Sequence, residues 1–331
     1  MKRKEWIIIF ILAALLIVSA IISIGMGSVS IKVTDILSVL QDHIFGHDST
    51  NSNDIIIWSI RLPRIVLAIL AGASLAVSGM LMQSIFHNPM ADPYIIGVSS
   101  GASLGGVAAI LLGFSSAGNM VGLCSFAGGL AATMIVYLLS KRRGKVPIST
   151  LLLTGIAVGG LLSAVTTAFL LGRSSTDLHT VLNWLMGSLA NRDWSHCQIL
   201  LPYTIVGLVI TFIFTRDLNI LAQGDETAHY LGIPIEKVRL ILLFTAAMLA
   251  SGTVAVTGII AFVGLIVPHI MRIITGPNHR ILLPASMLGG GILLTWADIA
   301  ARITLPDQEI PIGVVTSIIG CLFFLYLLKR Q

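Results

Sequence analysis

Residues 61–103 read RLPRIVLAILAGASLAVSGMLMQSIFHNPMADPYIIGVSSGAS. Two arginines flank Pro63 at the start, an apolar run follows to Ile85, and two prolines, an asparagine and an aspartate interrupt it before Gly97. A helix needs about 20 mostly apolar residues to cross a bilayer, so residues 63–85 predict a membrane-spanning helix. The prolines predict a break in helical structure close to the membrane.

Similar apolar runs fill the rest of the 331-residue chain, in which 56% of residues are hydrophobic types and 11% are charged. Soluble domains carry about 25% charged residues, so this composition excludes a soluble enzyme, a disordered chain and a disulfide-stapled secreted domain. We expect an all-α polytopic membrane protein, with residues 1–331 forming a single transmembrane domain. About ten spans are expected, at residues 6–26, 63–85, 93–112, 119–139, 149–171, 199–215, 239–257, 259–275, 281–301 and 311–328. The boundary between the seventh and eighth is the least defined, and Gly252, Gly258 and Gly264 offer places to turn.

The basic residues predict an orientation. With the N-terminus in the cytosol and alternating spans, fourteen of the 20 lysines and arginines fall in inner segments, as the positive-inside rule requires, and both termini are cytosolic. The net charge of +5 is therefore explained by orientation, and no nucleic-acid partner is expected. The first span follows Lys2, Arg3 and Lys4, as a signal peptide would, but its apolar stretch exceeds the usual 7–15 residues, so we expect it to remain uncleaved.

Catalytic and metal-binding patterns are missing from the sequence. No GxxxxGK[ST] and no HExxH can be written, and the three cysteines have no metal-ligand spacing. We therefore predict no catalytic residue, no metal site and no cofactor in this chain. ATP-driven transport would require another chain to bind the nucleotide.

Six basic residues fall in the outer segments, and three of these stand out: Arg61, Arg64 and Arg302. They could extend to lipid phosphates, or they could bind the carboxylates of a docking protein. Asp298 lies four residues before Arg302, so these two side chains can pair on one helix face.

The interrupted stretch after the second span is a candidate for the translocation pathway, because irregular backbone at membrane depth is tolerated only inside protein or beside water. Helix packing by small residues is an equally good interpretation. The candidate pathway residues are Asn88, Pro89, Asp92, Pro93, Gly97, Ser99 and Ser100.

The loop of residues 216–238 is the most charged internal segment. Asp225 to Gly232 reads as a short helix that ends at a glycine, and Pro234 reads as the start of a second short helix. Together they predict a compact knob, which is either a solvated loop or a docking site for a cytosolic partner.

These landmarks resemble the permease subunits of the iron-siderophore, haem and cobalamin ABC importers, the FecCD-type or type II importers. The matching stretches appear in family order and cover about residues 55–330. They are Arg61–Arg64, Asn88–Pro93 with Gly97–Gly101, Trp184–Leu189, Leu231-Gly232, Phe262–His269, Leu283–Ala285, Ala297–Arg302 and Glu309–Val314.

The resemblance implies a type II permease fold of ten spans in the membrane of a prokaryotic cell, a homodimer, two cytosolic ATPases that bind ATP and Mg, and an external substrate-binding protein. It implies that Arg61, Arg64 and Arg302 meet glutamates of the binding protein, and that Ser149 lies at an inner gate. It also implies that the 216–238 loop couples to the ATPase. The coupling residues would be Asp225, Glu226, His229, Leu231, Gly232 and Ile233.

The implied function is import by alternating access, with a ferric siderophore as the expected substrate and cobalamin or haem left open. An ion-coupled secondary transporter is the alternative, but Asp298 is the main intramembrane carboxylate available to it and has Arg302 as a partner. A membrane-embedded enzyme lacks paired catalytic residues.

Overall fold

The structure, a computed structural model, describes residues 3–26, 31, 33–45, 54–114, 119–142, 144–305 and 308–330. These residues are almost entirely helical. The helices are α1 (Arg3–Gly25), α2 (Val33–Phe45), the π-helix η1 (Ile55–Arg61), α4 (Leu62–Ile85), the 3-10 helix η2 (Pro93–Ile96), α5 (Val98–Leu111), α6 (Met120–Ser140), α7 (Ile148–Leu170), α8 (Ser175–Leu185), α9 (Trp194–Ile213), α10 (Thr215–Leu221), α11 (Asp225–Tyr230), α12 (Ile235–Thr257), α13 (Val263–Thr275), α14 (His279–Ile303) and α15 (Ile312–Arg330).

The predicted membrane architecture is confirmed. Among the described residues, seven helices are long and apolar enough to cross a membrane, and three shorter apolar helices correspond to α5, α13 and α15. In chain order these ten match the ten spans expected from the sequence. The remaining helices, α2, α8, α10 and α11, lie in the connections between them.

Two expected spans are shorter than the sequence suggested, because the backbone reverses beside each of them. The span at 93–112 is divided at Gly97, whose φ of 83° separates η2 from α5. The span at 259–275 begins only at Val263, since Gly258 and Phe262 both have positive φ. Gly258 is the predicted break in the long apolar run, whereas Gly252 and Gly264 lie inside helices.

Three expected spans begin earlier than predicted. The second continues back through η1 to Ile55, and the sixth begins at Trp194, where Asp193 caps the helix. The seventh begins at Ile235, directly after Pro234. The expectation of a second short helix after Pro234 is therefore wrong. No proline or glycine follows Ile235 before Gly252, so the charged turn at Glu236 continues into the membrane helix.

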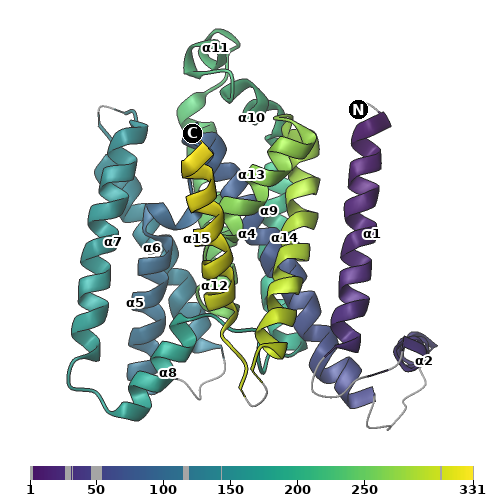
Figure 1. Cartoon of the computed structure of the whole chain (residues 1–331). Coiled ribbons are helices and arrows are strands. Elements are labelled where there is room, and N and C mark those ends of the chain that lie inside the picture. Colours follow the sequence, from purple (N-terminus) through teal and green to yellow (C-terminus); the bar gives the residue numbers. More distant parts are fainter. Residues whose placement is uncertain are drawn as a thin grey trace.

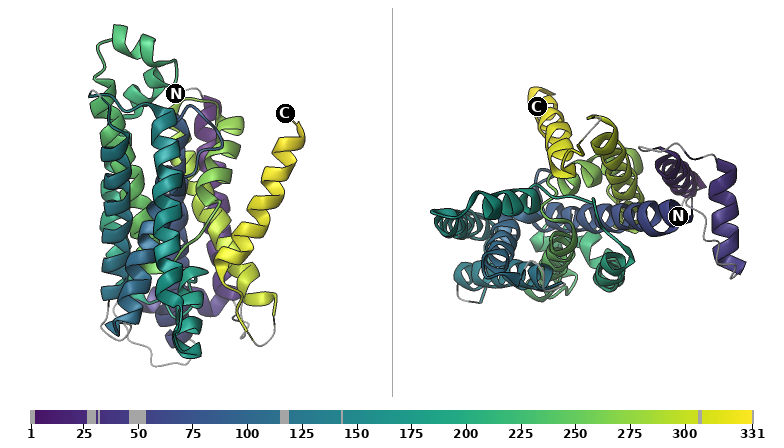
Figure 2. Two further views of the ribbon diagram at one scale, coloured as in Figure 1. Left: turned by 90° about the vertical axis from the view of Figure 1, so that its left-hand side faces the viewer. Right: turned by 90° about the horizontal axis from the view of Figure 1, so that it is seen from below.

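The bundle has a buried centre and an exposed periphery. Most of the apolar stretch of α4, α12 and α14 is buried inside the chain, whereas most of α1, α6, α7 and α9 faces outward. Helices α4 and α14 touch at Gly72 and Gly290, where a side chain on either would overlap the other's backbone. Helices α7 and α1 lie on opposite sides of the bundle in Figure 1 and in the view from below, and the side view in Figure 2 shows α15 leaning away from the bundle.

The two ends of the bundle are distinct. The start of α1, the end of α15 and the short helix α11 lie at one end, which we call the α11 end (Figure 1). The opposite end, which we call the α2 end, holds α2 and α8. Arg61 and Arg64, at the start of α4, lie at the α2 end together with the last turn of α14.

Candidate docking and pathway sites

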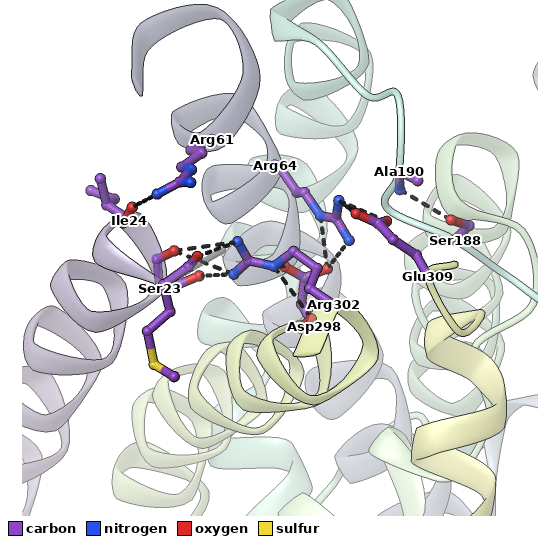
Figure 3. A network of polar contacts seen from close by, with 10 residues as sticks. Ser23, Ile24, Arg61, Arg64, Ser188, Ala190, Asp298, Arg302 and Glu309 are labelled. Carbon is purple, nitrogen blue, oxygen red and sulfur yellow. Dashed lines mark hydrogen bonds and ion pairs between the residues drawn. The ribbon is translucent and has the colours of Figure 1, made fainter. Parts of the chain in front are cut away.

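Two of the predicted docking residues, Arg64 and Arg302, meet around one buried carboxylate at the α2 end. Arg64 on α4 places Nη2 2.8 Å from Asp298 Oδ1, and Arg302 places Nε 3.1 Å from Asp298 Oδ2 (Figure 3). Asp298 and Arg302 are one turn apart on α14, so the pairing predicted from their spacing is confirmed. The Asp298 side chain is only 1% exposed, and an aspartate so deeply buried needs both cations to offset its desolvation.

A second carboxylate completes this network. Glu309, in the connection between α14 and α15, places Oε2 3.0 Å from Arg64 Nη1. Its side chain is 43% exposed, which makes it the accessible member of the group (Figure 3). Glu309 opens the Glu309–Val314 motif, and its sequence alone indicates no role for it. We call Arg64, Asp298, Arg302 and Glu309 the α2-end ion network.

Arg61 and Arg302 also hold the last turn of α1. Arg61 Nη1 donates to the Ile24 carbonyl, and Arg302 Nη2 donates to Ser23 Oγ at 2.7 Å (Figure 3). Arg302 Nη1 donates to the Met26 carbonyl at 3.0 Å. The last carbonyls of a helix have no partner within the helix, so these arginines stabilise its end. They also fix α1 against α14.

The three arginines all lie at the α2 end, but they are less accessible than a docking role would suggest. Arg61 is 6% exposed as a residue, and the side chains of Arg64 and Arg302 are 11% and 8% exposed. Each guanidinium already contacts groups within this chain.

The interrupted stretch after α4 lies partly on the α11-end surface. His87 Nε2 is 2.7 Å from the carbonyl of Leu221, which is the last residue of α10. Asn88 and Pro89 are exposed beside it, and the Asn88 side chain accepts a hydrogen bond from the Met90 N–H. Asp92 caps η2 by accepting from the Tyr94 N–H at 2.9 Å, and Pro93 is buried. The Asn88–Pro93 segment thus forms a hydrogen-bonded turn that connects α4 and η2.

Gly97 and Gly101 serve helix packing. Both lie against Ala132 of α6, and a side chain at Gly101 would overlap the backbone of Gly128. For these two glycines the structure supports the packing interpretation over the pathway interpretation.

The serines of the same segment lie differently. Ser99 and Ser100 are half-buried, and Ser100 Oγ accepts a hydrogen bond from Ser163 of α7 at 3.3 Å. Ser149 is exposed in the first turn of α7, and no contact brings it to Ser99 or Ser100. The predicted pathway residues therefore do not form one site within the described chain.

The predicted knob at the α11 end has a defined internal structure. Helix α11 is followed by Gly232 with φ of 76°, the Gly232 N–H donates to the His229 carbonyl, and the Ile233 N–H donates to the Ala228 carbonyl. This pair of bonds is the Schellman ending predicted for a helix closed by glycine. Asp225 at the start of α11 accepts from Arg239 Nη2 at 2.8 Å, which ties the knob to α12. We call α10, α11 and residues 231–234 the α11 knob.

The surface of the α11 knob is apolar at its tip. Tyr230 is 87% exposed and Leu231 is 61% exposed, while Ala228 beneath them is fully buried. Glu226 and His229 are exposed beside them, and Ile233 packs partly against the core. Large apolar side chains exposed on a rigid knob are typical of an interaction site. Sequence reasoning missed α10, although Asp217 in its first turn is a helix-start signal.

Metal-binding groups do not gather in the part of the chain that the structure describes. No three His, Cys, Asp or Glu side chains lie close enough to hold a metal ion there.

A polytopic helical bundle with an ion network at one end and a rigid knob at the other defines a membrane transport subunit. The chain belongs to the FecCD transport family, which it matches over residues 15–330. This family consists of ABC transporter permease subunits, so the chain is a transport subunit.

Two curated relatives illustrate the match. The chain is 45% identical over 279 residues to the cobalamin import system permease protein BtuC of Halobacterium salinarum, covering 84% of this chain and 74% of that protein. It is 39% identical over 334 residues to the Fe(3+)-citrate import system permease protein YfmE of Bacillus subtilis, covering 100% and 97%.

A solved structure agrees with the fold. It is described as an inward-facing conformation of a metal-chelate type ABC transporter and superposes with a TM-score of 0.84 at 33% identity, covering 99% of this chain and 100% of that one. The expected type II ABC importer permease fold is confirmed.

Proposed function

We propose that this chain imports a ferric siderophore or a similar metal chelate, which it receives from an external substrate-binding protein. ATP and Mg would be bound by two copies of a separate cytosolic ATPase, and this chain would carry no cofactor. The observation that carries the proposal is the family match across nearly the whole chain, with relatives named for ferric citrate and cobalamin import.

The orientation we propose places the α11 end in the cytosol of a prokaryotic cell, with both termini there. The expected inner basic residues support it, because the 141–145 connection and the α11 knob lie at the end that holds both termini. The segment of residues 216–238 is then the coupling loop. We propose that its working part is the knob, since residues from Ile235 onward belong to α12.

The α11 knob suits a stable contact with an ATPase. Obligate interfaces are more hydrophobic than transient ones, and the tip of the knob exposes Tyr230 and Leu231. Asp225, Glu226, His229 and Gly232 would frame that contact, with Ile233 anchoring the knob from below. Because the knob has a fixed shape, a movement of the ATPase would be transmitted directly to α12.

The α2 end is suited to a partner that binds transiently. Charged interfaces speed association and lose strength in salt, and the ion network at this end contains one exposed carboxylate, Glu309. Arg61, Arg64 and Arg302 would meet acidic groups of the binding protein. For Arg64, the incoming acid would have to replace Glu309 at Nη1.

A second copy of the chain fits the apolar faces left open on α7 and α15. Leu153, Ile156 and Leu161 of α7 are exposed, as are Leu322 and Leu325 of α15. We propose that these faces, rather than one chain alone, enclose the pathway. Ser99, Ser100 and Ser149 would then border it near α7.

The mechanism we propose is alternating access. ATP binding would bring the two ATPases together, the knobs would move with them, and the two permease chains would rock against each other. The binding protein would supply selectivity. Fewer polar groups are then required along the pathway than in an ion-coupled transporter.

The proposal is tested by reconstituting the permease with its ATPase and binding protein in liposomes. We expect substrate-loaded binding protein to stimulate ATP hydrolysis and uptake, and an ion gradient alone to drive none. Uptake driven by an ion gradient without the ATPase would contradict the proposal and favour a secondary transporter.

Cobalamin is the second candidate substrate, because the relative that matches at 45% identity imports it. The iron-citrate relative matches over the full length of this chain, and for that reason we place a ferric chelate first. Competition between radiolabelled ferric chelates, haem and cobalamin for the same binding protein distinguishes them.

A further inference from the structure

A cavity of about 530 Å³ opens at the α2 end between α5, α6, α8, α9 and α12. Its Arg192 also lines a neighbouring hollow that includes Arg64 and Glu309 of the α2-end ion network. Its walls are mostly apolar, and Trp184, Phe126 and Tyr203 contribute aromatic rings. The rings of Phe126 and Tyr203 lie 4.7 Å apart and close its inner part. Arg192 and His196 are the charged or titratable side chains in its lining.

The cavity is elongated along one face of α9. His196, Ile199 and Tyr203 all line it, and their spacing of three and four residues places them on the same side of the helix. At a rise of about 1.5 Å per residue this stripe is roughly 10 Å long. Arg192 precedes α9, so it lies at the end of the stripe nearest the membrane boundary.

Arg192 makes few hydrogen bonds within the described chain, although the Asp193 carboxylate lies close to it. Its one hydrogen bond in the described structure runs from Nη1 to His196 Nε2 at 3.0 Å, and its buried Nε has no partner. The neighbouring Asp193 carboxylate instead accepts from Ser195 and contacts His196, and these hydrogen bonds lower the pKa of Asp193 to about 2. Burial lowers the pKa of Arg192.

The two arginines of the α2-end ion network, unlike Arg192, each form an ion pair with a buried carboxylate. Arg64 and Arg302 each pair with the Asp298 carboxylate. A partly buried guanidinium with unused donors is costly unless an anion meets it. Because a guanidinium matches phosphate oxygens with parallel donors, a phosphate is a suitable anion.

The mouth of the cavity opens on an apolar surface. Met120 and Leu123 of α6 line the cavity and are exposed, and Leu201, Ile205 and Val209 of α9 are exposed beyond it. In a membrane protein such a surface contacts acyl chains. The cavity therefore offers a cation at the headgroup level and an apolar, aromatic groove that leads inward from it.

We propose that this cavity binds an anionic phospholipid, with its phosphate on Arg192 and one acyl chain along α9 toward Tyr203. The site lies in the leaflet at the α2 end. The proposal does not depend on which substrate the transporter carries.

The test counts lipids bound to the purified full-length chain by native mass spectrometry during titration with phosphatidylglycerol or phosphatidylcholine. We expect one phosphatidylglycerol to bind about tenfold or more tighter than phosphatidylcholine, and Arg192→Gln to abolish that preference, since a charge-assisted contact is lost. Arg173→Gln is the matched control, because Arg173 is exposed at the same end and donates to its own helix at Phe169. This control is expected to bind like the unmodified chain.

A second measurement places the acyl chain without altering Arg192. Phosphatidylglycerol with brominated acyl chains should quench Trp184, measured as the fluorescence difference between the chain and Trp184→Phe. Val121→Phe, which narrows the groove, should reduce both the quenching and the tight binding.

Three outcomes would overturn the proposal. The first is equal binding of the two lipids to the unmodified chain. The second is unchanged phosphatidylglycerol binding in Arg192→Gln. The third is displacement of the lipid by an equal concentration of inorganic phosphate, which would identify a site for a free anion.

Discussion

The α2 end and the α11 end of the bundle offer a partner different surfaces. At the α2 end, the charged groups are mostly buried and paired with one another, and Glu309 is the accessible member of the network. At the α11 end, the charged pair Asp225–Arg239 braces the knob from beneath, while Tyr230 and Leu231 face outward. Charge thus supports structure at both ends, and at the α11 end two large apolar side chains stand exposed on the tip of the knob.

The difference indicates how each partner binds. A partner at the α11 knob gains apolar burial at once, as in long-lived complexes. A partner at the α2 end must compete with groups inside the chain, so its binding is expected to be weaker and sensitive to salt. The following substitutions test this contrast, beginning with the largest expected effect.

Asp298→Asn is expected to cause the largest loss of folding stability. Loss of this buried carboxylate leaves Arg64 and Arg302 close together without their shared anion, and breaking such a pair costs about 3–5 kcal/mol. Chemical unfolding of the purified chain in detergent measures the loss. Glu309→Gln is the control, and an equal effect in both variants would show that Asp298 is not the centre of the network.

The double substitution Tyr230→Ser and Leu231→Ser is expected to weaken ATPase binding by roughly 2 kcal/mol, or about 30-fold in affinity, because buried apolar anchors dominate interfaces. The stability of the permease should change little, since both side chains are exposed. Affinity is measured with the purified ATPase. Leu305→Ser, at an exposed apolar residue of the α2 end, should leave it unchanged.

Gly232→Val is expected to distort the α11 knob at a cost of about 1–2 kcal/mol, because an L-residue is strained at positive φ. No neighbouring atom blocks the added side chain, so the effect comes from the backbone alone. We expect uptake per ATP hydrolysed to fall. Gly172→Val has the same backbone strain at the opposite end, and a matching loss of coupling there would refute the assigned role.

Glu309→Gln is expected to have the smallest effect on stability, below about 1 kcal/mol, because the pair is partly exposed. It frees Arg64 Nη1, so affinity for an acidic binding protein should rise a few-fold at low salt and converge with the unmodified chain at high salt. Glu226→Gln at the α11 end is the control. Charge reversal of Arg64 is a poor test of docking, because it would also place a negative charge beside Asp298.

The expectations that held are those that depend on nearby residues. Apolar runs define spans, Gly232 ends a helix, and residues 298 and 302 are one turn apart, so each is readable from local spacing. The break at Gly258 is readable in the same way.

The features that the sequence did not reveal, and the one expectation that was wrong, depend on tertiary structure. Glu309 is 245 residues from Arg64, so no local pattern indicates their contact. Phe262 adopts positive φ although it is not glycine, and only its surroundings hold it there. Pro234 with Glu236 and Lys237 resembles the start of a surface helix, and the continuation to Thr257 is visible only once packing is known. The cavity at Arg192 likewise requires five helices to form.

The continuity of α12 gives the chain a mechanical property. Its 23 residues, at about 1.5 Å each, make a rod of roughly 35 Å that begins at the knob. The far end rests on the segment after α8, where the Ser188 N–H donates to the Thr257 carbonyl at 2.7 Å. By simple geometry, a tilt of about 5° at the knob moves that far end by roughly 3 Å if the rod pivots at the knob. The same helix thus joins the knob at one end of the bundle to the segment after α8 at the other.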